Sequence, residues 1–130
     1  MGNRAVLTFS TTANAPCIYL HWNGGMASVE GFLSAARTLG LRRMQSQAKT
    51  MDQLATMIAR HFFGVDVGMT VYRERYGQSD ANNYDNGVYM LSPDLTISGR
   101  IYKQRMDEVD PVKTREIHDY VTAKAPIFND

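Results

Sequence analysis

The chain has 130 residues, of which 44% are hydrophobic and 21% charged, and its formal net charge is +1. This length suits one compact domain, and so small a net charge excludes a strong overall attraction to nucleic acid or to an anionic membrane. No apolar run approaches the ~20 residues that cross a bilayer, and the single cysteine, Cys17, excludes an intramolecular disulfide. We therefore expect a soluble, cytoplasmic protein that binds neither a membrane nor nucleic acid directly.

The first quarter of the chain predicts a β-hairpin. Residues 4–9 and 17–22 alternate apolar and polar side chains, and turn-forming residues fill positions 10–16 between them. Asn23, Gly24 and Gly25 then end the second strand, because glycine adopts a tight exit conformation without steric cost.

Two helices are predicted next. Ser28 is a plausible N-cap for the first, and Gly40 supplies its stop. A basic link over residues 41–49 leads to a second helix that Gly64 ends. Its apolar stripe is formed by Met51, Leu54, Ile58 and Phe62.

The second half of the chain predicts strands followed by one more helix. Residues 67–75, 87–91 and 96–103 have strand character, and residues 77–86 have the composition of a loop. Asp110 caps the amides of a helix that starts at Pro111 and runs to about Lys124.

The resulting order, ββααβββα, predicts a single α+β domain over residues 1–130, with an antiparallel sheet and helices on one face. Exposed sheet edges invite pairing with a second copy, and the last helix follows a charged link over residues 104–110. We therefore expect a homo-oligomer in which the helix of residues 111–124 contacts a neighbouring subunit.

Candidate binding residues concentrate between positions 72 and 102. Tyrosine rings stack on bases, guanidinium groups hold phosphate oxygens, and Asn and Asp contact hydroxyl and amino groups, so this mixture suits a nucleotide-like ligand. The same alternation also fits an ordinary solvated sheet face. The residues concerned are Tyr72, Tyr76, Tyr84, Tyr89 and Tyr102, with Arg73, Arg75, Arg100, Asp80, Asn82, Asn83 and Asp85.

A second candidate site comprises His21, Trp22 and the glycines at positions 24 and 25, although packing under the hairpin explains the same residues. Cys17 lies on the same strand as His21 but roughly a dozen ångströms away at strand rise, too far for direct contact. The sequence contains no recognisable set of acid, base and nucleophile and no metal-ligand spacing. We therefore expect a protein without enzymatic activity, cofactor or metal.

Four segments, residues 2–6, 18–25, 86–89 and 97–100, resemble those of small proteins encoded by phages and prophages. The chain is similar to the first-described type of phage Thoeris anti-defence proteins. This resemblance implies an oligomeric sponge in the host bacterial cytoplasm that sequesters cyclic ADP-ribose signals, made by bacterial immune enzymes, without cleaving them.

The resemblance also implies a set of ligand-binding residues. Asn83 and Asp85 would contact ribose hydroxyls or the base edge, and Arg100 would hold the pyrophosphate. Two positions stay open: either Tyr72 or Tyr76 stacks on adenine, and either Arg4 or Arg37 supplies a second arginine.

Two other functions remain as alternatives. A protein-binding inhibitor of a bacterial defence complex, such as an anti-CRISPR, would present acidic surface, and Asp107, Glu108 and Asp110 form one acidic cluster. An enzyme that cleaves the same signals is the third, and it has the least support from the residues.

Overall fold

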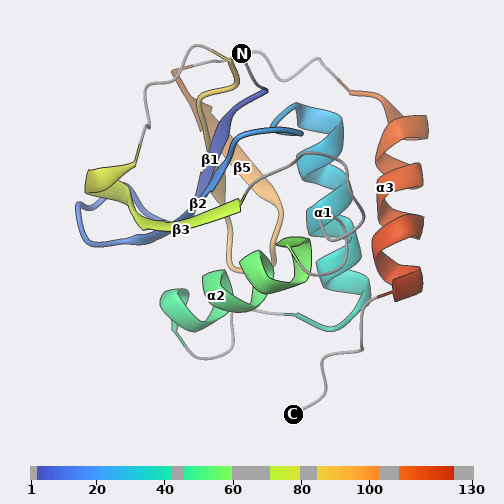
Figure 1. The fold of residues 1–130 in the computed structure, drawn as a ribbon, viewed down its shortest axis with the longest axis horizontal. Coiled ribbons are helices and arrows are strands. Elements are labelled where there is room, and N and C mark those ends of the chain that lie inside the picture. Colours follow the sequence, from blue (N-terminus) through green and yellow to red (C-terminus); the bar gives the residue numbers. More distant parts are fainter. Residues whose placement is uncertain (1–2, 42–45, 60–70, 80–84, 103–108, 125–130) are drawn as a thin grey trace.

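The structure is a computed structural model that describes residues 3–41, 46–59, 71–79, 85–102 and 109–124. Over these residues the chain is an α+β domain (Figure 1), and its order of strands and α-helices agrees with the predicted ββααβββα. None of the helices in these ranges is long and apolar enough to cross a membrane. The elements are β1 (Ala5–Thr8), β2 (Pro16–Leu20), α1 (Met26–Thr38), α2 (Gln47–Met57), β3 (Val71–Arg75), the 3-10 turn η3 (Tyr76–Gln78), β4 (Val88–Leu91), β5 (Ile97–Ile101) and α3 (Pro111–Lys124).

The five strands form one sheet in the order β3-β2-β1-β4-β5. The predicted hairpin is present, with Ala5 of β1 opposite Leu20 of β2. β1 and β4 are parallel, whereas a wholly antiparallel sheet was expected. Periodicity predicts strands but not their partners, and β4 pairs on the side of β1 that β2 leaves free. The sheet is therefore mixed, and β1 is its central strand.

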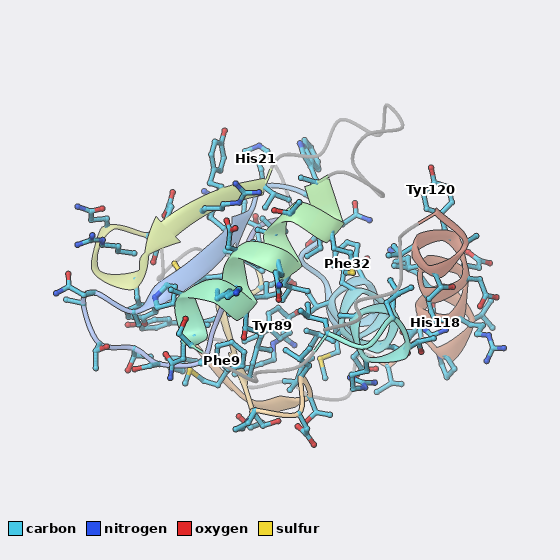
Figure 2. The ribbon with its side chains drawn as sticks, turned by 90° about the horizontal axis from the view of Figure 1, so that it is seen from below. Phe9, His21, Phe32, Tyr89, His118 and Tyr120 are labelled. Carbon is cyan, nitrogen blue, oxygen red and sulfur yellow. The ribbon has the colours of Figure 1, made fainter. Side chains whose placement is uncertain are left out.

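α1 and α2 cover one face of the sheet and close the main core. Alternate strand residues point into it, because side chains of a strand alternate between the two faces. Phe32 of α1 is completely buried there, between the helix and the strands (Figure 2). Other large buried members are Leu7, Ile18, Leu20, Leu33, Leu54, Met57, Ile58 and Tyr89.

The start of α1 corrects one prediction. Its N-cap is Gly25 rather than Ser28, which lies in the first turn with its side chain buried. The cause is a close approach at Gly24, where an added Cβ would lie 2.5 Å from the backbone oxygen of Asn3. Because the chain must turn there, the helix begins directly after the two glycines.

α2 begins earlier than predicted, because Ser46 caps it by accepting a hydrogen bond of 3.1 Å from the amide of Lys49. Residues 47–49, assigned to the link, are helical. The predicted continuation through Phe62 to Gly64 lies outside the described residues.

α3 has the predicted bounds, and Asp110 accepts a hydrogen bond of 3.1 Å from the amide of Lys113. It forms a third layer on α1, on the side away from the sheet (Figures 1 and 2). The helices approach closely at Gly31, where an added Cβ would lie 2.7 Å from the Ile117 side chain. Thus α3 covers α1 of its own chain, and a contact with a neighbouring subunit stays a prediction.

Candidate functional site

The face of the sheet opposite α1 and α2, here called the far face, is built on a small apolar cluster of its own. Val6, Cys17 and Val88 are buried there. Partly buried residues pack against these three: Tyr19, Tyr76, Met90 and Ile101. The far face therefore has an apolar floor, over which larger and more polar side chains are arranged.

Four aromatic side chains, here called the aromatic row, are linked by ring contacts that include Tyr19 on this floor: Tyr72, Tyr19, His21 and Trp22. Tyr72 of β3 stands opposite Tyr19 of β2, and their ring centroids are 5.4 Å apart. His21 follows at the end of β2 (labelled in Figure 2), with its Nδ1 3.3 Å from the Tyr19 hydroxyl and its ring 5.3 Å from that of Trp22. Tyr72 is 47% exposed and Trp22 39%. Two large aromatic rings are thus presented to solvent by partners that fix their orientation.

A charged pair lies beside the aromatic row. Arg4 directly precedes β1, and the amide of its neighbour Asn3 donates a hydrogen bond of 3.0 Å to the His21 carbonyl. The Arg4 Nε and backbone amide each lie 2.9 Å from Oδ2 of Asp85. Burial alone would raise the pKa of the Asp85 carboxyl, but the hydrogen bonds and charge of Arg4 outweigh it and lower that pKa below 3.8. Both side chains are partly exposed, so an oriented cation and anion are available to solvent at the end of the sheet where Asn3 bonds to His21.

Arg100 lies at the same end of the sheet but faces the helix side. It stands opposite Tyr89, and its guanidinium carbon is 4.5 Å from the centroid of that ring. Its Nη2 donates a hydrogen bond of 3.1 Å to the Asn86 carbonyl, and the residue is only 8% exposed. The structure therefore places Arg100 within the framework that supports Arg4 and Asp85, and its contact with a pyrophosphate stays a prediction.

Sequence analysis left two choices open, one between two tyrosines and one between two arginines, and the members of each pair lie in different places. Tyr72 belongs to the aromatic row, whereas Tyr76 begins η3 and packs on the floor of the far face. Burial, followed by the neighbouring Tyr102 hydroxyl, raises the Tyr76 pKa. Arg37 donates a hydrogen bond of 2.6 Å to the Leu95 carbonyl, far from the row, which makes Arg4 the better placed early arginine. Asn83 lies outside the described residues.

Cys17 lies below these side chains and is buried. Burial, reinforced by the Glu74 carboxylate and opposed by a hydrogen bond from Ser79, raises the pKa of its thiol to about 11. Such a thiol stays protonated at neutral pH and is a poor nucleophile. Within the part of the chain that the structure describes, no group of three or more His, Cys, Asp or Glu side chains is placed to hold a metal ion.

A cavity of about 850 Å³ borders β3 and α2. Arg73 and Arg75 line it, but Arg73 is 3.3 Å from Asp52 and Arg75 donates a hydrogen bond of 3.5 Å to Asn14. Asp52 thus balances the charge of Arg73, whereas the partner of Arg75 is a neutral amide. Among the residues that the structure describes, the cavity lining has no exposed aromatic ring that would indicate a particular ligand class.

Sequence analysis did not anticipate one contact. Ser34 of α1 and His118 of α3 bring Oγ and Nδ1 to 2.8 Å, although 84 positions separate them along the chain. Spacing gave no signal for this contact, because the two residues lie on helices in distant parts of the chain. Their proximity follows from the packing of α3 on α1.

Comparisons with known proteins give no indication of function, so the inferences below rest on the geometry. Protein-family models, curated proteins and solved structures were each searched, and none gave a significant match.

Proposed function

We propose that this protein binds a nucleotide-type signalling molecule at the aromatic row and holds it without cleaving it. The observation that carries the proposal is the pair of exposed rings, Tyr72 and Trp22, beside the aligned Arg4 and Asp85. The resemblance to Thoeris anti-defence proteins narrows the ligand to a cyclic nucleotide of the cyclic ADP-ribose type. The biological role that we propose is therefore sequestration of an immune signal.

The aromatic row supplies the attraction for a base. Stacking of one base on an aromatic side chain contributes about 1–3 kcal/mol, as judged from alanine substitution. The Tyr72 ring rests on Tyr19, with 32° between the ring planes, and Tyr19 is in turn in contact with His21. Because the partners restrict the ring before a ligand arrives, less rotational entropy is lost on binding.

Arg4 and Asp85 supply complementary polar groups. A guanidinium binds phosphate oxygens in a planar, two-pronged geometry, and a carboxylate accepts hydrogen bonds from ribose hydroxyls or exocyclic amines. Arg4 is oriented by Asp85, and its neighbour Asn3 is hydrogen-bonded to the His21 backbone. A ligand that stacks on the row therefore brings its ribose and phosphates toward this pair.

Retention without cleavage follows from the residues available around the row. Cys17 is buried and its thiol pKa is about 11, which removes it as a nucleophile at neutral pH. The His21 imidazole is hydrogen-bonded to the Tyr19 hydroxyl, and this bond orients the two rings relative to each other. We therefore expect reversible binding with full recovery of the ligand.

Native mass spectrometry with a panel of cyclic ADP-ribose isomers and cyclic oligonucleotides tests the proposal. We expect intact ligand at a fixed number per oligomer, reduced retention in Tyr72→Ala, and unchanged retention in the control Val112→Ala, which truncates an exposed side chain of α3. Ligand released by heating should have its original mass and chromatographic position.

Two outcomes contradict the proposal. A folded protein that retains no member of the panel is not a nucleotide sponge, and co-purification with a defence complex would then favour the protein-binding inhibitor. Chemically altered ligand would instead show cleavage.

A further inference from the structure

We propose that the groove between α1 and α3 is a second site, in which Ser34 is a nucleophile toward small carboxylic esters and His118 is its general base. The claim is independent of the nucleotide site, because α3 lies on the side of α1 away from the sheet (Figures 1 and 2). It rests on the hydrogen bond of 2.8 Å between Ser34 Oγ and His118 Nδ1. Serine and imidazole at this distance are the central pair of hydrolases with unrelated folds.

The pair lies on the wall of a substrate-sized space. A cavity of about 500 Å³ has Ser34, His118 and Arg115 in its wall. A second cavity, of about 330 Å³, shares Glu30, Ser34 and Thr114 with the first. Both Ser34 and His118 are partly exposed, so a ligand in the groove reaches the hydroxyl and the imidazole.

Contacts other than the Ser34–His118 hydrogen bond hold α3 on α1, so helix packing does not require that hydrogen bond. The two helices meet at Gly31 and Ile117, and Thr114 donates a hydrogen bond of 2.9 Å to the Ala27 carbonyl. Along α1 these contacts lie one and two turns before Ser34, where they already hold the helices together. Alanine at position 34 would serve an α-helix at least as well as serine, because serine has the lower helix propensity.

The lining of the larger cavity indicates the substrate class. Val109 and Pro111 offer an apolar wall for a short acyl chain. Arg115, one turn before His118, is 3.2 Å from Asp119 but 78% exposed, so its remaining N–H groups can still face the groove, and Glu30 adds one carboxylate to the same wall. Positive charge stabilises the oxyanion that forms when a carbonyl carbon is attacked. An uncharged ester with a small acyl group therefore matches the groove better than a phosphate ester or a long lipid.

The reaction needs no further reagent than water. Ser34 Oγ bonds to the carbonyl carbon while its proton passes to His118 Nδ1, and the carbon–oxygen bond to the alcohol then breaks as the alcohol takes that proton. Water attacks the acyl-serine and gives a proton to His118. The carboxylic acid leaves, and the proton returns from His118 to Ser34 Oγ.

A fluorophosphonate probe, followed by intact mass measurement and peptide mapping, tests this site on the whole chain. We expect a single adduct, on Ser34, which is absent in Ser34→Ala and unchanged in the control Ser98→Ala on β5. His118→Gln should label about 100-fold more slowly, since a general base contributes about 10²–10⁴-fold. Release of p-nitrophenol from p-nitrophenyl butyrate should follow the same order among the variants.

Wild-type labelling decides the matter even if a variant fails to fold. A folded wild-type protein that forms no Ser34 adduct overturns the proposal, as does ester hydrolysis that is equal in Ser34→Ala. Equal labelling rates in wild type and a folded His118→Gln would show that His118 is not the general base, and would contradict the proposed mechanism.

Discussion

The two faces of the sheet are made from the same strands but from different kinds of residue. On the helix side, Leu7, Ile18 and Tyr89 are completely buried under α1 and α2. On the far face, the buried floor is small, and Tyr19, Tyr72 and His21 lie over or beside it in a chain of ring contacts. The helix side holds most of the buried apolar residues, and the ligand site that we propose lies on the far face, so substitutions should separate stability from binding.

The largest expected effect is on the helix side. Phe32→Ala removes a completely buried ring from the centre of the core and should lower the free energy of unfolding by about 3–5 kcal/mol. Urea denaturation followed by circular dichroism measures the loss. Val112→Ala, which truncates an exposed side chain, should stay within about 0.5 kcal/mol of wild type. A loss in Phe32→Ala no larger than this control would contradict the assignment of the main core.

A substitution of Arg100 tests whether this residue supports the fold or binds the ligand. Arg100 is 8% exposed, lies over the Tyr89 ring and donates a hydrogen bond to the Asn86 carbonyl. Loss of a hydrogen bond from a charged group costs about 1.5–3 kcal/mol, so Arg100→Ala should be destabilised by an amount in this range. Urea denaturation is again the measurement.

The same variant distinguishes framework from ligand contact. If Arg100→Ala unfolds at the same urea concentration as wild type but no longer binds the cyclic nucleotide, Arg100 holds the ligand as the family resemblance implied. If it loses stability while the remaining folded protein binds normally, the role is structural.

Tyr72→Ala should have the opposite signature, a change in binding with little change in stability. Loss of one stacking partner should weaken the affinity for the retained nucleotide by about 1–3 kcal/mol. The unfolding midpoint should hardly move, because the ring is 47% exposed. Isothermal titration calorimetry measures the affinity, and Tyr72→Phe, which keeps the ring, is the matched control. Equal affinity in Tyr72→Ala and wild type would remove the ring from the site.

Local patterns in the sequence predicted most of the fold, because strand and helix periodicity need only neighbouring residues. The predicted start of α1 at Ser28 was wrong, because the chain turns at Gly24, close to Asn3, and the helix begins directly afterwards. The parallel pairing of β1 with β4 was also missed, since it depends on contacts between distant parts of the chain.

The candidate sites depend even more on contacts between residues that are far apart in the sequence. Arg4 and Asp85 are 81 positions apart and form a pair only when β1 lies beside β4. Asp85 was named both from the residue types between positions 72 and 102 and from the family resemblance, whereas Arg4 was named only from the resemblance, as an alternative to Arg37. Ser34 and His118 were not named as a pair at all, because only helix packing brings them together.

The smallest expected effect concerns the charged pair beside the aromatic row. Arg4 lowers the pKa of Asp85 below its ordinary 3.8 in the folded protein. The pair therefore stabilises the fold above that ordinary value, and its contribution is lost as the pH falls through the lower, folded-state pKa. Both side chains are partly exposed, so the contribution should be at most about 1 kcal/mol.

Asp85→Asn should therefore melt below wild type at pH 7, and the difference should be smaller at pH 2, because the contribution of the pair is lost as the pH falls through the lowered folded-state pKa. Thermal unfolding at both pH values measures it, with Asp119→Asn, which breaks the more exposed pair with Arg115, as the control. A difference that is the same at both pH values would mean that the Asp85 carboxylate does not act through its charge. In that case a ligand phosphate could bind Arg4 without displacing a stabilising charge interaction with Asp85.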